Sequence, residues 1–220
     1  MAPATQTEAF AADRQNMVDL QLRARGISDQ RVLQAMAKVP RHEFVPENFR
    51  SQAYEDHPLP IGEGQTVSQP YIVALMLEVL ALSPSDKVLE VGTGSGYVAA
   101  LLGQLAAEVY SVERFPELAQ EAADRLLRLG CTNVKVLVGD GSAGLPSHAP
   151  FDAILVSAAA PQIPPALIAQ LRSGGRMVIP VGPPNVQELQ LVRNQEGEVT
   201  IQRLEGCCFV PLIGSHGYPA

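Results

Sequence analysis

The chain has 220 residues, 46% of them hydrophobic and 18% charged, which is the balance of a folded globular protein rather than a disordered one. The formal net charge is −7 and no basic run occurs, so we expect no binding to nucleic acid. Residues 1–15 lack the apolar core of a secretion signal, and no segment approaches the roughly 20 apolar residues of a membrane span, so we expect a cytoplasmic protein that does not associate with membranes.

Helical patterns dominate the first part of the chain. Apolar spacing predicts helices over residues 16–25 and 29–39, which are followed by a glycine and a proline. Residues 41–65 are rich in proline and glycine and are interpreted as an irregular connection. A third helix is predicted to follow Ser68, with Pro70 in its first turn.

From residue 84 onward, short apolar runs alternate with helical patterns, which predicts parallel strands joined by helices that cover both faces of a sheet. Two last strands flank the turn residues 194–197, so the sheet is expected to end in an antiparallel hairpin. The expected fold is α/β, a Rossmann-like, mostly parallel, doubly wound sheet. In this interpretation residues 1–83 are a helical and substrate-loop extension, residues 84–220 are the cofactor-binding domain, and both form one compact unit. The predicted strands are 87–91, 109–113, 134–138, 151–156, 176–181, 188–193 and 200–204, and the predicted helices are 96–106, 116–129 and 164–171.

The strongest local signal is Val88–Tyr97, a buried strand followed by a glycine-rich turn and the start of a helix. Its glycines let the backbone turn tightly and pass close to a ligand, and the helix start offers free N–H groups. Glu113 ends the next strand, where a carboxylate can accept hydrogen bonds from both hydroxyls of a ribose. Residues 139–141 end the third strand, where their backbone and the Asp140 carboxylate can reach an adenine. These features predict a nucleotide-cofactor site at the carboxyl edge of the sheet.

Two kinds of cofactor fit such a crevice. Residues 94–99 also satisfy the Gly-x-Gly-x-x-Ala pattern of nicotinamide dehydrogenases, so a dehydrogenase is an alternative. S-adenosylmethionine is favoured because Glu90, just before the glycines, can help to hold the amino acid end of that cofactor, and because a terminal hairpin is typical of methyltransferases. A P-loop is excluded, since no Gly-Lys-Ser/Thr follows the glycines.

Several longer segments resemble the protein-L-isoaspartate O-methyltransferase family, and together they cover roughly residues 14–214. The most specific is Gly64-Gln65-Thr66-Val67-Ser68-Gln69-Pro70-Tyr71, which precedes the predicted cofactor domain. The glycine turn alone would be shared with all methyltransferases of this class. The other matching segments are 39–46, 53–54, 58–62, 149–154, 158–161, 174–176, 180–182 and 209–212.

The resemblance implies a class I methyltransferase that uses S-adenosylmethionine, releases S-adenosylhomocysteine and methylates the free α-carboxyl of L-isoaspartyl residues in damaged proteins and peptides. The ester then closes to a succinimide, part of which hydrolyses to normal aspartate. The family's active-site serine corresponds to Ser68, and the expected substrate-binding residues are Thr66, Ser68 and Val210. We expect a monomer. The expected cofactor-binding residues are Thr66, Val67, Glu90, Gly92, Thr93, Gly94, Ser95, Gly96, Glu113, Arg114, Asp140 and Gly141.

A carboxylate acceptor is already ionised at pH 7, so its methylation needs no general base. Ser68 and Thr66 offer hydroxyl donors that can orient such a carboxylate. Ser68 is also a good cap for the helix that starts near Pro70, and the two roles stay open. A non-catalytic relative is a further alternative, against which the intact Ser68, Glu113 and glycine turn argue. No metal is expected, because the cysteines and histidines show no ligand spacing.

Overall fold

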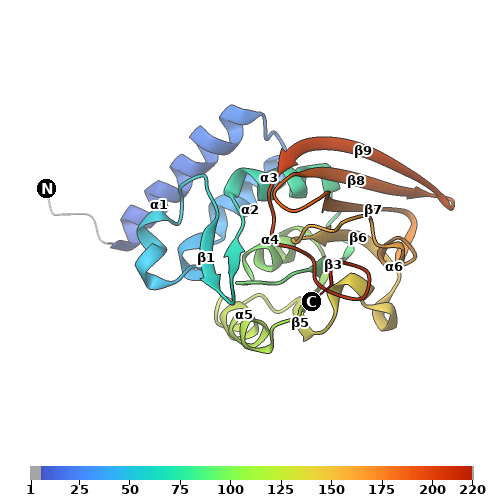
Figure 1. Cartoon of the computed structure of the whole chain (residues 1–220). Coiled ribbons are helices and arrows are strands. Elements are labelled where there is room, and N and C mark those ends of the chain that lie inside the picture. The colour runs from blue at the N-terminus through green and yellow to red at the C-terminus, as the bar shows by residue number, and fades with distance from the viewer. Residues whose placement is uncertain (1–5, 220) are drawn as a thin grey trace, which may run out of the picture.

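In the computed structural model, which describes residues 6–219, a seven-stranded sheet has the order β5-β4-β3-β6-β7-β8-β9 (Figure 1). The strands from β5 to β7 pair in parallel, whereas β8 and β9 are antiparallel. The predicted mostly parallel sheet with a terminal hairpin is therefore confirmed. The strands are β3 (Lys87–Val91), β4 (Glu108–Glu113), β5 (Val134–Val138), β6 (Phe151–Val156), β7 (Leu171–Val181), β8 (Gln187–Gln195) and β9 (Glu198–Cys207).

The two faces of the sheet are covered unequally. On one face, α3 (Pro70–Leu80) and α4 (Tyr97–Leu105) bury the larger core, and α5 (Pro116–Arg128) packs beside them against β4 and β5. The other face packs against short segments, among them α6 (Pro165–Ile168). The helix predicted over 164–171 is a single turn, because β7 begins at Leu171 and the Gln170 carbonyl already accepts from the Phe151 N–H of β6.

The N-terminal helices pack onto the α3–α4 side of the sheet. α1 (Gln6–Asn16) continues into the π-helix η1 (Met17–Leu22) and a 3₁₀ turn, η2 (Arg23–Arg25), and starts earlier than expected. α2 (Gln30–Lys38) is capped by the Asp29 carboxylate. Apolar residues from these helices belong to the same buried cluster as α3, α4 and the sheet, so the extension has no separate core.

A short antiparallel hairpin, β1 (Leu59–Gly62) and β2 (Gln65–Val67), follows the 3₁₀ turns η3 (Arg41–Phe44) and η4 (Glu47–Gln52). The sequence predicted only an irregular connection here. Four- and three-residue strands with a proline carry little local signal, and burial of their apolar ends in the common core stabilises them. This hairpin delivers the Thr66–Ser68 segment to the carboxyl edge of the sheet.

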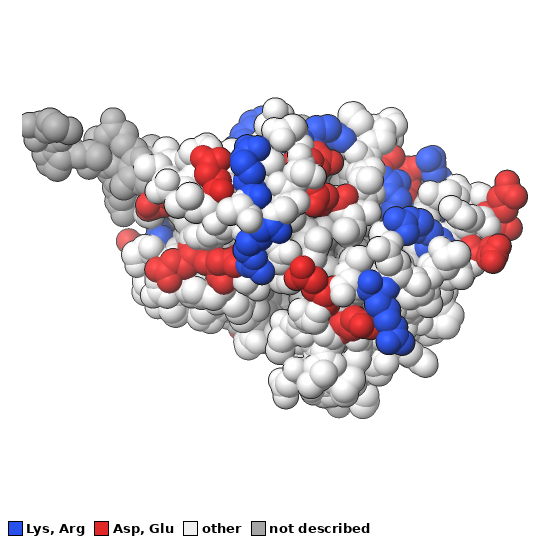
Figure 2. Space-filling model, turned by 90° about the horizontal axis from the view of Figure 1, so that it is seen from above, with Lys and Arg blue, Asp and Glu red and all other residues white. Residues whose placement is uncertain are grey.

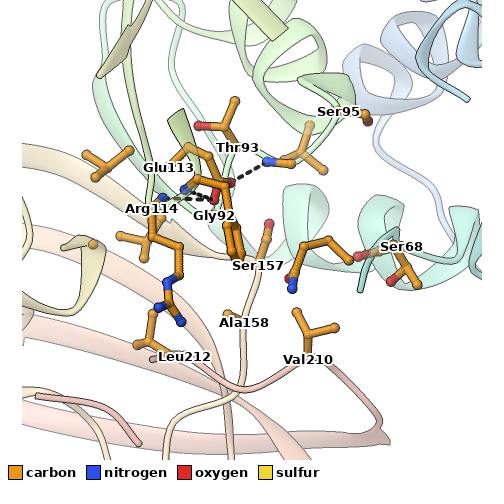
Figure 3. Close-up of a pocket in the computed structure, with 18 of the residues that line it drawn as sticks. Ser68, Gly92, Thr93, Ser95, Glu113, Arg114, Ser157, Ala158, Val210 and Leu212 are labelled. Atoms are coloured by element: carbon orange, nitrogen blue, oxygen red, sulfur yellow. Dashed lines mark hydrogen bonds between the residues drawn. The ribbon is translucent and has the colours of Figure 1, made fainter. Parts of the chain in front are cut away.

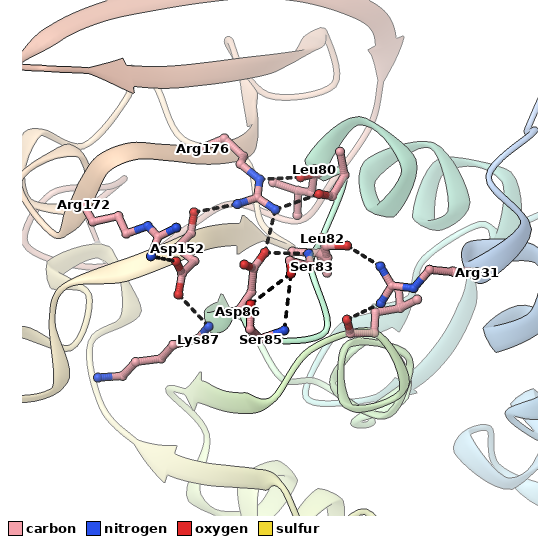
Figure 4. Close-up of polar contacts among 12 residues, drawn as sticks. Arg31, Leu80, Leu82, Ser83, Ser85, Asp86, Lys87, Asp152, Arg172 and Arg176 are labelled. Carbon is pink, nitrogen blue, oxygen red and sulfur yellow. Dashed lines mark hydrogen bonds and ion pairs between the residues drawn. The ribbon is translucent and has the colours of Figure 1, made fainter.

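A polar network closes the opposite, amino-terminal edge of β3 (Figure 4). Arg176 binds the carboxylate of Asp86 at 2.6 Å and the carbonyl of Ala81 at 2.8 Å. Arg31 donates to two carbonyls, those of Leu82 and Leu105, and so joins α2 to the ends of α3 and α4. Within residues 6–219, no helix has the length and apolar character needed to cross a membrane.

Candidate active site

A cavity open to solvent lies at the carboxyl ends of β3, β4 and β6 (Figure 3). Figure 3 places Glu113 and Ser68 on opposite sides of it, with Val210 and Leu212 of the C-terminal segment along another wall. Most of the residues expected in the site therefore meet in one place. Those that line the cavity are Thr66, Val67, Ser68, Gly92, Thr93, Gly94, Ser95, Glu113, Arg114, Gly141 and Val210.

The glycine turn forms the floor of the cavity. Gly92, Gly94 and Gly96 have φ values of 92°, 52° and 88°, which residues with a Cβ rarely adopt. Gly96 does not line the cavity; it is the left-handed N-cap of α4, and a Cβ there would lie 3.3 Å from Ala122. Gly96 was expected to bind the cofactor, but in the structure it shapes the turn against α5.

Glu113 is 5% exposed and its carboxylate faces the cavity while it fastens the turn. One oxygen accepts from the Gly94 N–H at 2.8 Å, and the other accepts from Arg114 and Phe115 N–H groups at 2.8 and 3.1 Å. A carboxylate has about four acceptor positions, so one remains on the oxygen that binds Gly94. Glu113 can thus hold a hydroxyl group of a ligand and the turn at once.

Glu90 does not line the cavity, contrary to the expectation that it holds part of the cofactor. Successive strand side chains point to opposite faces, and Glu90 shares with Val88 the face that α4 buries. Its carboxylate accepts from Ser111, whose hydroxyl lies 2.5 Å from that of Thr93, and one carboxylate oxygen has no partner. Burial raises the pKa of Glu90 to about 8, against the hydrogen bond from Ser111. Glu90 therefore supports the turn from behind as a protonated acid at pH 7.

The Asp140 carboxylate also points elsewhere than expected. It accepts from Ser142 and from the N–H and hydroxyl of Ser215, at 2.6 to 2.9 Å, and so holds the C-terminal segment. Burial opposes ionisation, but these hydrogen bonds prevail and lower the pKa of Asp140 to about 2. Only the neighbouring Gly141 reaches the cavity, where a Cβ would lie 2.6 Å from Val91. The expected contact of the Asp140 carboxylate with an adenine is not supported, because its acceptor positions are taken.

The structure also decides how α3 is capped. Its N-cap is Gln69, which makes no side-chain capping bond, and the Tyr71 N–H instead donates to the Asp56 carboxylate at 3.1 Å. The interpretation of Ser68 as a helix cap is therefore wrong. In the described part of the chain, no hydrogen bond involves the Ser68 hydroxyl, whereas the Ser68 carbonyl accepts from Arg41 at 2.8 Å.

A second pocket adjoins the first beyond Ser68. The two share Thr66, Ser68, Ser157 and Val210, and the second pocket adds apolar and thiol side chains. Ser157, which directly follows β6, was not among the expected site residues, although β6 lies next to β3 and its carboxyl end meets the same edge. The residues found only in the second pocket are Pro58, Gln69, Ile72, Gly206, Cys207, Cys208 and Phe209.

Comparison with known proteins gives one consistent result. The family model described as "Protein-L-isoaspartate(D-aspartate) O-methyltransferase (PCMT)" matches residues 12–217. Protein-L-isoaspartate O-methyltransferases of Koribacter versatilis and Methanoculleus marisnigri are 59% and 58% identical to the chain, over 99% and 94% of it and 98% and 94% of their own lengths.

A solved structure agrees with the sequence relatives. It is that of a Plasmodium falciparum protein described as a putative protein-L-isoaspartate O-methyltransferase in complex with S-adenosyl-L-homocysteine. It has a TM-score of 0.80 and 27% identity, over 91% of this chain and 98% of that one. The chain thus has the class I methyltransferase fold and belongs to the protein-L-isoaspartate(D-aspartate) O-methyltransferase family.

Proposed function

We propose that the chain transfers the methyl group of S-adenosylmethionine to the free α-carboxyl of L-isoaspartyl residues in damaged proteins and peptides. The observation that carries this proposal is the cavity itself. It joins a glycine turn and a carboxylate that can accept from a ribose hydroxyl, and it adjoins a second pocket beyond Ser68. One side suits the cofactor and the other suits a peptide.

The residues on the Glu113 side fit the cofactor. Glu113 keeps an acceptor position for a ribose hydroxyl. In the turn, the Gly92 and Gly94 N–H groups are already bonded, whereas those of Thr93 and Ser95 donate to no acceptor in the described chain and can bind the amino acid end. A Cβ on Gly141 would lie 2.6 Å from Val91, so the backbone itself forms the wall where an adenine is expected. When bound, S-adenosylmethionine supplies a methyl carbon already activated by its sulfonium. Arg114 and Val67 border the same space.

The Ser68 side is proposed to orient the acceptor carboxylate. The hydroxyls of Ser68 and Thr66 can donate to one carboxylate oxygen and leave the other free to attack the methyl carbon in line. No histidine or lysine of the described residues lines either pocket, and none is needed, because the acceptor has a pKa of about 4. Val210 borders both pockets and is proposed to pack against the peptide.

Labelled S-adenosylmethionine and a matched pair of peptides test this function. We expect a base-labile methyl ester on the isoaspartyl peptide and almost no label on the aspartyl peptide. Equal labelling of both, or label on Lys or Arg side chains, contradicts the proposal. The dehydrogenase alternative predicts binding of nicotinamide cofactor instead, and the terminal hairpin in place of a second nucleotide-binding half argues against it.

We further propose that the enzyme acts as a cytoplasmic monomer without binding nucleic acid, with residues 1–83 as the part that frames the substrate. The net charge of −7 supports the absence of nucleic-acid binding. On the face seen in Figure 2, acidic and basic side chains are interspersed rather than gathered into a basic stripe. Light scattering and a filter-binding assay with duplex DNA check these two points.

A further inference from the structure

Arg41 is completely buried and is among the largest such side chains of the described residues; it lies behind the Ser68 segment. Its Nε donates to the Ala53 carbonyl at 2.7 Å and its Nη2 to the Ser68 carbonyl at 2.8 Å. Its guanidinium lies 4.8 Å from the ring centre of Tyr97, which lines the cavity. The side chain therefore contacts both the Ser68 backbone and Tyr97, the first residue of α4.

The Arg41 charge is not neutralised by an ion pair. Among the salt bridges of residues 6–219, none involves Arg41, and its Nη1 has no hydrogen-bond partner. Burial lowers its pKa, but a guanidinium remains protonated in proteins. A buried unpaired charge is costly, and an apolar side chain of similar volume is usually the more stable choice. Arg41 offsets part of this cost through its two carbonyl acceptors and the ring of Tyr97, and among the described residues no carboxylate lies within ion-pair distance of it. An anionic ligand beside the Ser68 segment would supply the opposite charge that Arg41 lacks.

The acceptor in the proposed reaction is an anion, and the Ser68 side has no cation that lines it. Arg114, the only basic residue that borders the main cavity in the described chain, lies on the Glu113 side (Figure 3). A buried guanidinium is weakly screened by water and salt, so its field extends into the adjoining cavity. Its contacts with the Ser68 carbonyl also fix the backbone that carries the hydroxyl.

We propose that Arg41 is a positioning residue that holds the Ser68 backbone and makes the Ser68 side electrostatically selective for a carboxylate. This inference rests on the proposed function. It predicts that removing the charge of Arg41 weakens binding of a carboxylate ligand more than binding of a neutral one. A purely structural role of Arg41 would weaken both equally.

The test compares two peptides on the enzyme saturated with S-adenosylhomocysteine. One peptide carries the isoaspartyl α-carboxylate, and the other carries the neutral α-carboxamide in its place. The measurement is the dissociation constant of each peptide, and the preference is the ratio of the two constants. We expect wild type to bind the carboxylate peptide more tightly. Arg41→Met should reduce the ratio on the order of tenfold, the size of one charge interaction. Arg41→Lys keeps the charge and should restore most of the preference. In a separate assay with S-adenosylmethionine its turnover should still be reduced, because a lysine lacks the planar fork that reaches both carbonyls.

Arg31→Met is the matched control. Arg31 also donates to two carbonyls and joins separate elements, but at the opposite edge of the sheet (Figure 4). It should lower the melting temperature without changing the preference for the carboxylate. Arg41→Gln serves as a second neutral variant if Arg41→Met does not fold. Equal weakening of both peptides in the neutral Arg41 variants overturns the inference. Failure of wild type to bind the isoaspartyl peptide instead counts against the proposed function itself.

Discussion

The two sides of the cavity are built in opposite ways. The Glu113 side comes from neighbouring strand ends, and the hydrogen bonds of Glu113 span 1, 2 and 19 residues of sequence. The Ser68 side is assembled from more distant segments. Arg41 binds the Ser68 carbonyl across 27 residues, and the hydroxyl of Tyr71, three residues after Ser68, donates to Glu205 across 134 residues. The cofactor side is therefore encoded by a local motif, whereas the substrate side depends on the tertiary fold. Variants should affect one side without the other.

The broadest effect is expected at Glu113, because its side chain serves both the cofactor and the glycine turn. Glu113→Ala removes charge-assisted hydrogen bonds worth roughly 1.5–3 kcal/mol, so affinity for S-adenosylhomocysteine should fall on the order of tenfold to a hundredfold. The melting temperature should fall as well, because the Gly94 N–H loses its acceptor. Calorimetry and thermal melts check both. Glu113→Gln, which keeps one acceptor oxygen, should lie between wild type and alanine. Unchanged affinity in the alanine variant would remove Glu113 from the cofactor side.

Ser68→Ala and Asp56→Ala separate catalysis from helix capping. A lost hydrogen bond to a charged group is worth roughly 1.5–3 kcal/mol, so Ser68→Ala should lower turnover on the order of tenfold to a hundredfold. Its melting temperature should stay near wild type, since Ser68 caps no helix. Asp56→Ala should instead cost about 1 kcal/mol of stability. Turnover and melting temperature are measured on the same preparations. Full activity of Ser68→Ala would refute its proposed role.

Glu90 should make stability depend on pH. Its pKa in the folded protein is about 8, against a reference value of 4.5. The stabilising contribution of its bound proton is complete below about pH 4.5 and is lost as pH rises through about 8. Glu90→Gln should therefore match wild type near pH 5 and melt at a higher temperature than wild type near pH 9. Parallel pH curves for the two proteins would contradict the buried, protonated Glu90.

The smallest effect is expected from modification of Cys208, an exposed thiol that lines the second pocket. Alkylation with iodoacetamide should slow methylation of the isoaspartyl peptide several-fold and leave affinity for S-adenosylhomocysteine unchanged. Cys208→Ser treated with iodoacetamide is the control for alkylation of the two other cysteines, and it should keep its activity. Loss of cofactor affinity on alkylation would contradict the separation of the two sides.

Much of the fold followed from the sequence, because strand and helix periodicity and the glycine turn are local patterns. Prediction failed where a role depends on side-chain direction or a distant partner. Glu90 and Asp140 are carboxylates placed next to the cofactor site in the sequence. Glu90, however, points to the face under α4, and Asp140 accepts hydrogen bonds from Ser215 instead. Serine is a favourable N-cap residue, yet the carboxylate that accepts from the first turn of α3 is that of Asp56, which lies in another loop. Nothing local marks Arg41 as a partner of Ser68.

The most direct test follows the fate of one isoaspartyl peptide with enzyme and S-adenosylmethionine by mass spectrometry. The proposed function predicts a methyl ester on the isoaspartyl α-carboxyl, then a succinimide, then a growing share of the normal aspartyl peptide. The same peptide with Ser68→Ala should pass through these stages more slowly, and the aspartyl peptide should stay unmodified. An isoaspartyl peptide that remains unmethylated by wild type, or an aspartyl peptide methylated equally fast, would contradict the proposal.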